Sequence, residues 1–327
     1  MNTRGKKIET LLQYIRTNTD TAERELIIDR MKNRQTNKAK LLLSILFPEY
    51  VQPCRLPDRF GQLTSVFRSY RFLDVVPNSG FISIAFTPRC LTADANFPIL
   101  QVRYNLSGAN VVAASGDNFM QSENVFDYFD SAVLRAAVIR VYYIGSQEYQ
   151  KGYFCGGIDY SFDVQTAANT GASGTVYSLN AIENGFNKRF SGPEEGVRFA
   201  YLPRGNNELA FEELATNVTT SRNQQAILIY GRNLAPDCSI RIDIIRHIEG
   251  LPKESVRPYM SVKRPEPGEP DDVYEVISEL TTSVSDMVNF SQAEARSMYG
   301  EFREHFNTMY SDEVPPVYSK YGDVIPL

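Results

Sequence analysis

The chain has 327 residues, of which 43% are hydrophobic and 22% are charged, so it is not wholly disordered and can hold one large domain with appended segments or two modest domains. No apolar run of roughly 18 residues occurs, and the residues after Met1 lack an apolar stretch, so we expect neither a membrane span nor a secretion signal. The net charge of −5 divides into +5 for residues 1–40, with ten Lys/Arg and five Asp/Glu, and −10 for the remainder.

Residues 1–47 are predicted to form a basic, partly helical arm. Apolar residues fall at helical spacing from Ile8 to Ile15, and Asp20 with Glu23 resembles a capping box that starts a second helix. Eight basic residues are candidate nucleic-acid contacts: Arg4, Lys6, Lys7, Arg30, Lys32, Arg34, Lys38 and Lys40. Arg30, Arg34 and Lys38 repeat every four residues and share one helical face. That face is either a solvated surface or a surface that binds phosphates without reading base sequence.

Residues 48–250 predict a mainly β domain, because apolar and polar residues alternate in short runs separated by Gly, Pro, Asn and Asp. The expected strands are Ser65–Val75, Gly80–Thr87, Phe97–Tyr104, Leu134–Ile144, Tyr153–Val164, Val197–Leu202, Glu208–Asn217, Gln225–Tyr230 and Ser239–His247. Eight or nine strands with uneven connections favour a two-sheet sandwich or a jelly roll over an up-and-down barrel, and we expect an antiparallel eight-stranded jelly-roll sandwich. We expect Thr166–Thr175 and Gly185–Glu195 to be loops.

Residues 251–327 are expected to form a C-terminal extension that contains a helix. Five prolines between Pro252 and Pro270 predict a stiff extended linker, and an amphipathic helix is predicted over Asp272–Tyr310 before an extended tail. The extension has 14 acids and seven bases. This balance favours a helix that docks on the sandwich or on a neighbouring subunit over a cationic, membrane-disrupting helix.

The sequence offers little for catalysis or cofactor binding. It has two histidines, His247 and His305, and no P-loop, Gly-x-Ser-x-Gly or His-Glu-x-x-His motif, so we predict no enzyme activity and no cofactor. Glu123, Asp127 and Asp130 are close in sequence and suit calcium, but a solvated acidic loop is the simpler interpretation, and we assign no metal ligand.

The cysteines also point away from a metal or disulfide framework. Cys54, Cys90, Cys155 and Cys238 are widely spaced and form no C-x-x-C pair. Buried thiols in a reducing compartment are therefore expected.

Three segments, in the same order and with similar spacing, resemble nodavirus-like coat proteins of small icosahedral viruses. They are Phe47–Asp58, similar to the peptide before the first shell strand; Asp130–Gly145, similar to a long shell strand; and Ala226–Pro252, similar to the closing hairpin. The bacilladnaviruses, which have single-stranded DNA, are thought to carry coats of this type, so the resemblance leaves RNA and DNA genomes both open. The arm is less basic than nodavirus arms, and no Asn-Ala bond lies near the C-terminus, so we expect no self-cleavage.

The resemblance implies a structural capsid protein that assembles with copies of itself into an icosahedral shell around a single-stranded genome; shells of the family are usually T=3. In such a shell, we expect the arm to face the interior and the two loops to face outward or line interfaces. The resemblance also implies a place in the virion after synthesis in the host cytoplasm, with no stable membrane insertion; the sequence does not identify a host receptor. A non-viral β-sandwich that binds proteins or carbohydrates is the alternative. A cupin-type enzyme is disfavoured by the shortage of histidines.

Overall fold

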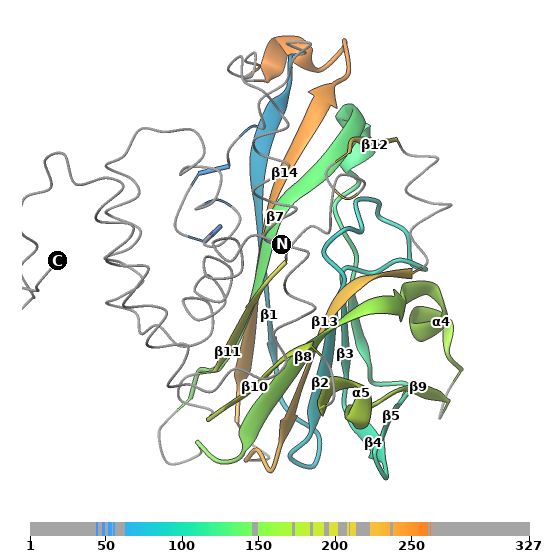
Figure 1. The fold of residues 1–327 in the computed structure, drawn as a ribbon, viewed down its shortest axis with the longest axis vertical. Coiled ribbons are helices and arrows are strands. Elements are labelled where there is room, and N and C mark those ends of the chain that lie inside the picture. The colour runs from blue at the N-terminus through green and yellow to red at the C-terminus, as the bar shows by residue number, and fades with distance from the viewer. Residues whose placement is uncertain are drawn as a thin grey trace, which may run out of the picture.

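The computed structural model describes residues 44, 48–49, 52–53, 55, 63–145, 150–171, 174–183, 186–192, 196–201, 208, 210–213, 223–235, 238–260 and 262. These residues form a mainly β structure in which every strand pairing is antiparallel (Figure 1). The helices expected within residues 1–47 and over residues 272–310 lie outside this part of the chain, except for Ser44.

The first sheet has the strand order β1-β14-β7-β11, and β12 pairs with another part of β7. Its strands are β1 (Ser65–Val75), β7 (Phe129–Tyr143), β11 (Val197–Ala200), β12 (Glu212–Glu213) and β14 (Ile240–Pro252). β14 lies between β1 and β7, and eleven of its thirteen residues are buried, because both faces of this central strand are covered.

The second sheet has the strand order β10-β8-β13-β2-β3-β6. Its strands are β2 (Ile82–Phe86), β3 (Leu100–Arg103), β6 (Asn118–Met120), β8 (Tyr153–Asp163), β10 (Phe186–Ser191) and β13 (Asn223–Arg232). A small third sheet, ordered β4-β5-β9, lies beside it. Its strands are β4 (Asn105–Ser107), β5 (Asn110–Val112) and β9 (Thr175–Ser178).

Short helices occupy some of the connections. They are η1 (Val125–Asp127), α4 (Val164–Asn169), α5 (Leu179–Glu183) and η3 (Arg257–Tyr259).

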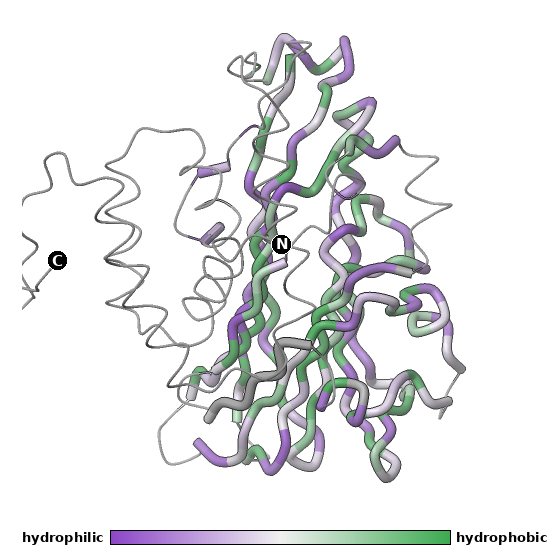
Figure 2. The backbone as a smooth tube through the Cα atoms, viewed as in Figure 1, coloured by the Kyte–Doolittle hydropathy of each residue, from purple (hydrophilic) through white to green (hydrophobic). Residues whose placement is uncertain are grey.

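One hydrophobic core joins the two large sheets, as expected for a sandwich. Ile242 of the first sheet and Ile229 of the second are both fully buried in it. Phe199 of β11 packs on Gly156 of β8 so closely that a Cβ atom at Gly156 would lie 2.4 Å from the Phe199 ring. Hydrophobic residues are concentrated along the strands of both sheets (Figure 2).

Each of the nine predicted strands overlaps an observed strand, and β1 has the predicted bounds. Five further strands were not predicted: β4, β5, β6, β9 and β10. The prediction of loops was wrong in two places. Helix α4 occupies the start of Thr166–Thr175, because the Asp163 carboxylate caps it by accepting from the Thr166 N–H at 2.9 Å. Strand β10 occupies most of Gly185–Glu195, where it pairs with β8.

The chain after Gly250 begins as the end of a strand. β14 continues to Pro252, whose position at the strand end requires no ladder N–H. A turn then leads into η3, and Met260 packs against the core. The proline-rich linker predicted from residue 251 therefore starts with a strand end, a turn and a short helix, and its part from residue 263 lies outside the described residues.

Candidate functional site

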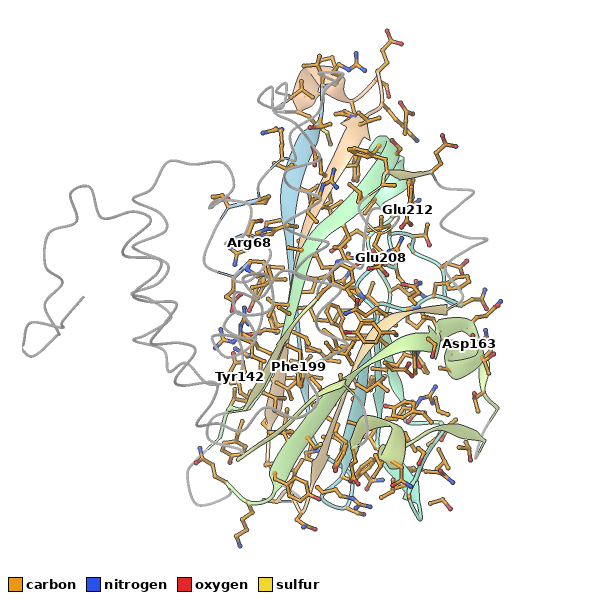
Figure 3. All side chains as sticks on the ribbon, in the orientation of Figure 1. Arg68, Tyr142, Asp163, Phe199, Glu208 and Glu212 are labelled. Carbon is orange, nitrogen blue, oxygen red and sulfur yellow. The ribbon has the colours of Figure 1, made fainter. Side chains whose placement is uncertain are left out.

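Two adjacent rows of side chains cross the outer face of the first sheet. Because Ile242 and Ile244 of β14 are in the core, the intervening Asp243 points away from it. The strand register aligns the rows as Phe72–Asp243–Arg140–Arg198 and Asp74–Arg241–Tyr142. Figure 3 shows Arg68 and Tyr142 on this side of the molecule.

The Asp243 carboxylate connects two tyrosines of this face. It accepts from the Tyr70 hydroxyl at 3.1 Å and from the Tyr142 hydroxyl at 2.9 Å. Desolvation and the adjacent carboxylate raise the pKa of both phenols. The phenols therefore stay protonated and remain donors to Asp243 at neutral pH.

A second contact orients the aromatic residues of β1. The Arg241 guanidinium makes two 2.8 Å hydrogen bonds to the Asp74 carboxylate, and this contact lowers the pKa of Asp74. The same guanidinium lies 5.0 Å from the centroid of the Phe72 ring. Tyr70 and Phe72 are nevertheless 53% and 54% exposed, so this part of the face is available for contact.

Glu49, which precedes β1 in the chain, lies on the other part of this face. The Glu49 carboxylate binds the buried Arg198 guanidinium through two hydrogen bonds of 2.5 and 2.9 Å, and Arg68 donates to the Glu49 carbonyl at 2.8 Å. Burial acts to raise the pKa of Glu49, but the Arg198 charge, the hydrogen bonds from Arg198 and smaller contributions together outweigh it, and the pKa is lowered. Glu49 therefore stays ionised and ties this segment to β11.

His247 lies fully buried under the same segment. Its Nδ1 is 2.9 Å from the Ser44 hydroxyl, and its Nε2 has no hydrogen-bond partner among the described residues. Burial, and secondarily the positive Arg68, lowers the pKa of His247 from 6.5 to about 4. A neutral imidazole enclosed in this way is a packing group and is not placed for acid–base chemistry on a substrate.

The buried imidazole predicts a pH dependence of stability. As the pH falls below 6.5, the unfolded chain binds a proton at His247 before the folded chain does, so the free energy of unfolding falls until the pH reaches about 4. The loss from this group is at most roughly 3 kcal/mol. Urea unfolding at several pH values between 7 and 4 should show a shallower slope for His247→Gln than for the parent chain. Parallel slopes for the two proteins would contradict this assignment.

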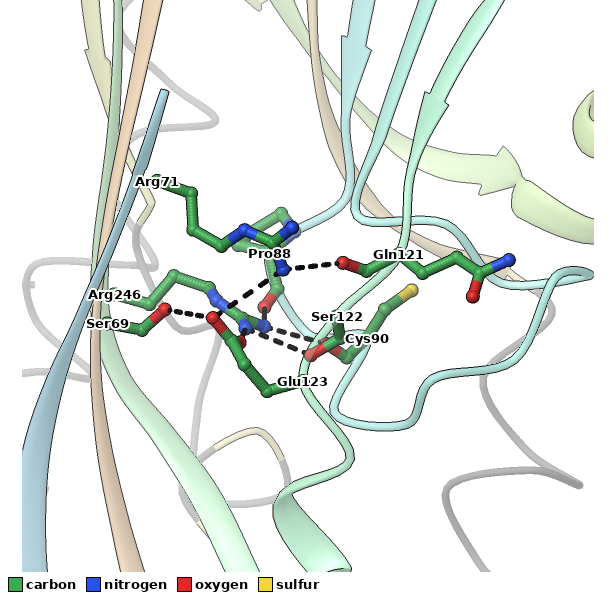
Figure 4. A network of polar contacts seen from close by, with 8 residues as sticks. All are labelled: Ser69, Arg71, Pro88, Cys90, Gln121, Ser122, Glu123 and Arg246. Atoms are coloured by element: carbon green, nitrogen blue, oxygen red, sulfur yellow. Dashed lines mark hydrogen bonds and ion pairs between the residues drawn. The ribbon is translucent and has the colours of Figure 1, made fainter. Parts of the chain in front are cut away.

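A buried arginine forms the centre of a network of polar contacts at one edge of the sandwich (Figure 4). Arg246 of β14 has no exposed surface; it donates to the Cys90 carbonyl at 2.7 Å and to the Ser122 hydroxyl at 2.9 Å. It also binds the Glu123 carboxylate at 2.5 Å, and Glu123 in turn accepts from the Ser69 hydroxyl at 2.8 Å. Burial lowers the pKa of Arg246. The network ties β14 and β1 to the chain that follows β6.

The possible calcium ligands do not converge. The Glu123 carboxylate is occupied by Arg246, Asp127 accepts from the Asn124 side chain at 2.6 Å, and Asp130 belongs to β7. Within the described part of the chain, no three His, Cys, Asp or Glu residues are grouped as metal ligands would be. Glu123 therefore neutralises a buried arginine in this structure.

Two other expectations bear on the site. All eight candidate nucleic-acid contacts, from Arg4 to Lys40, lie outside the described residues. Three of the cysteines, Cys90, Cys155 and Cys238, are buried as predicted, and burial raises the pKa of Cys90 to about 11. None of the helices that the structure describes is long and apolar enough to cross a bilayer.

The residues that the sequence did not reveal are the buried charged ones. Arg246, Arg198 and Arg103 are buried ion-pair partners, whereas a sequence pattern assigns arginine to the surface by default. The only available signal was the position of Arg246 on the core-facing parity of β14, two residues from Ile244 and Ile248.

The fold is similar to that of viral capsid proteins. Over 81% of this chain and 99% of the other, it matches VP2 of infectious bursal disease virus in a subviral particle, with 9% identity and a TM-score of 0.54. T=1 particles derived from that virus match over 84% and 98%, with 9% identity and a TM-score of 0.51. The T13 particle of that virus matches over 87% and 99%, with 8% identity and a TM-score of 0.50.

No family model matches the sequence, and no curated protein matches it. At such low identity, the similarity to solved structures establishes a shared fold. The expected likeness to virus coats is confirmed at that level, and the nodavirus type stays a prediction.

Proposed function

We propose that this chain is the structural capsid subunit of an icosahedral virus. The observation that carries the proposal is the fold match, which spans four fifths of this chain and nearly the whole of a protein solved as a viral particle. A non-viral β-sandwich that binds proteins or carbohydrates is the alternative, but none of these fold matches favours it. The role is structural, and copies of the same chain are the main partner.

The proposal includes an eight-stranded jelly roll. The orders β1-β14-β7-β11 and β10-β8-β13-β2 supply two four-stranded antiparallel sheets, and the chain passes between the sheets at nearly every step. In a jelly roll, long paired strands wrap around so that the chain alternates between two facing sheets. The alternation seen in this chain therefore supports a jelly roll. β3 to β6 would then be an insertion that widens the second sheet.

The proposal also assigns the ends of the chain. The arm, with Arg4, Lys6, Lys7, Arg30, Lys32, Arg34, Lys38 and Lys40, would face the shell interior and neutralise genome phosphates without reading sequence. Glu49, which follows the arm in the sequence, binds Arg198 on the outer face of the first sheet. The proposal therefore assigns that face to the interior side of the shell.

Electron microscopy of the expressed full chain tests the proposal. Uniform hollow particles tens of nanometres across are expected, and a monomer or trimer that persists across salt and pH would overturn the shell function. Changing the eight arm residues to glutamine should leave particles that contain much less nucleic acid, measured by the ratio of absorbance at 260 and 280 nm. Equal nucleic-acid content would refute the role of the arm without affecting the shell.

A further inference from the structure

β1 is a long strand at the edge of the first sheet. It has eleven residues, none of them Gly or Pro, and it pairs with β14 along its full length. Among the described strands, none pairs with its other edge (Figure 1). Half of its backbone N–H and C=O groups therefore point toward a position where a further strand would fit.

The exposed side chains of β1 are complementary to those of a second copy of β1 that runs antiparallel to it. Its exposed side chains are, in order, Arg68, Tyr70, Phe72 and Asp74: a cation, two aromatic rings and an anion. When a second copy of the strand runs antiparallel to the first, Arg68 faces Asp74 and Tyr70 faces Phe72. Opposite charges and aromatic pairs at facing positions are the pairs that stabilise antiparallel strands.

We propose that β1 pairs with β1 of a second copy of this chain, antiparallel and about a two-fold axis at Arg71. The two first sheets then form one continuous sheet across the axis. Such an interface is isologous, because each copy contributes the same strand and the same contacts. In this register, residues 67–75 of one copy face residues 75–67 of the other.

The inner face of β1 is compatible with this register. Phe67 faces Val75 of the other copy, which is an apolar pair. Arg71 faces its own equivalent at the axis, but each Arg71 donates to the Gln121 carbonyl at 3.0 Å and lies 3.7 Å from the Glu123 carboxylate. These contacts direct each guanidinium away from the axis and supply a counter-charge.

The outer side chains are already held in place before a second copy binds. Arg241 packs on the Phe72 ring, and the Tyr70 hydroxyl is fixed by Asp243. Because these side chains are already ordered, less conformational entropy is lost when the two strands pair.

The contact is small for a stable dimer. Nine paired residues span about 30 Å, and the area that they bury falls below the roughly 1,000 Å² of a stable interface. The pairing thus deepens the proposed shell function and rests on it, since many weak contacts of this kind stabilise a closed assembly. A covalent trap is therefore a better test than the size of an isolated dimer.

The test is a disulfide cross-link in the full chain with Arg71→Cys. Facing residues in antiparallel strands have Cα atoms about 4.5–5.5 Å apart, which is within the range of a disulfide. Under a mild oxidant, Arg71→Cys is expected to become a covalent dimer on a non-reducing gel, and to do so at least tenfold faster than Tyr70→Cys, whose thiol would face Phe72. The double variant Tyr70→Cys with Phe72→Cys should also cross-link, and it keeps the test available if Arg71→Cys fails to fold.

Two controls define the baseline. The parent chain reports any link through its native cysteines, and Tyr128→Cys, at a 52% exposed position outside β1, reports random collision. Fast cross-linking of Tyr70→Cys alone would overturn the register, and no link above baseline in either design would overturn the pairing. If shells form but the cross-link does not, the β1 pairing is refuted and the proposed shell function stands. If the cross-linked dimer forms but never gives shells, the proposed shell function is refuted and the pairing stands.

Discussion

Replacing Asp117 by asparagine is expected to lower the free energy of unfolding by about 3–5 kcal/mol, because it leaves the Arg103 guanidinium buried without a counter-charge. The side chains of Arg103 and Asp117 are 2% and 1% exposed. Arg103 also donates to the Ala167 carbonyl, so it cannot turn to water without breaking the link between β3 and α4. Asparagine keeps the shape of the side chain and can still accept from the Ala114 N–H, which now bonds the carboxylate at 2.8 Å. The measured loss therefore reports the charge.

Urea unfolding followed by circular dichroism measures this loss. Asp74→Asn is the matched control, because it makes the same change in an ion pair whose side chains, Arg241 and Asp74, are 34% and 38% exposed. Little change is expected there, since water replaces the lost contact. Equal effects at the two positions would contradict the buried-pair explanation.

The strands that local sequence predicts best are those whose side chains alternate strongly. β1, β7, β8 and β14 are rich in β-branched and aromatic residues, and all four were predicted. The bounds agree within one residue for β1 and β8, whereas β7 begins five residues before the predicted strand and β14 ends five residues after it. β4, β5 and β6 have three residues each and contain Asn or Ser, so no period can be read from them. They exist because the neighbouring chain offers backbone partners.

The order of strands within a sheet cannot be predicted from local sequence. β1 pairs with β14 across about 175 residues of sequence, as Val75 facing Ile240 and Ser65 facing Gly250 show. The same non-local pairing determines the candidate site: Phe72, Asp243 and Arg140 form one row only after three distant strands meet. The sequence could predict the sandwich class and the strands, but it could not predict this face.

The burial of charged side chains was the other feature that the sequence did not predict. A strand such as β14, which reads Ile240-Arg-Ile-Asp-Ile-Ile-Arg, resembles a strand with one wet face. One face lies in the core, and on the other face Ser44 lies against His247 while the Tyr70 and Tyr142 hydroxyls bind Asp243. The partners of its buried polar side chains come from segments that no local pattern connects to them.

Arg246→Met should lower the free energy of unfolding by about 3 kcal/mol, toward the lower end of the cost of breaking a buried pair. The change removes the donor for the Cys90 carbonyl and the Ser122 hydroxyl, and unsatisfied buried acceptors cost about 1–3 kcal/mol each. The Glu123 side chain is 40% exposed, so water can solvate its charge and limit the loss. Arg71→Met is the control, because Arg71 contacts the same carboxylate at 3.7 Å but is 36% exposed. Less than about 1 kcal/mol should be lost there. If the two variants unfold at the same urea concentration, then the Glu123 carboxylate, and not the buried guanidinium, stabilises this edge of the sandwich.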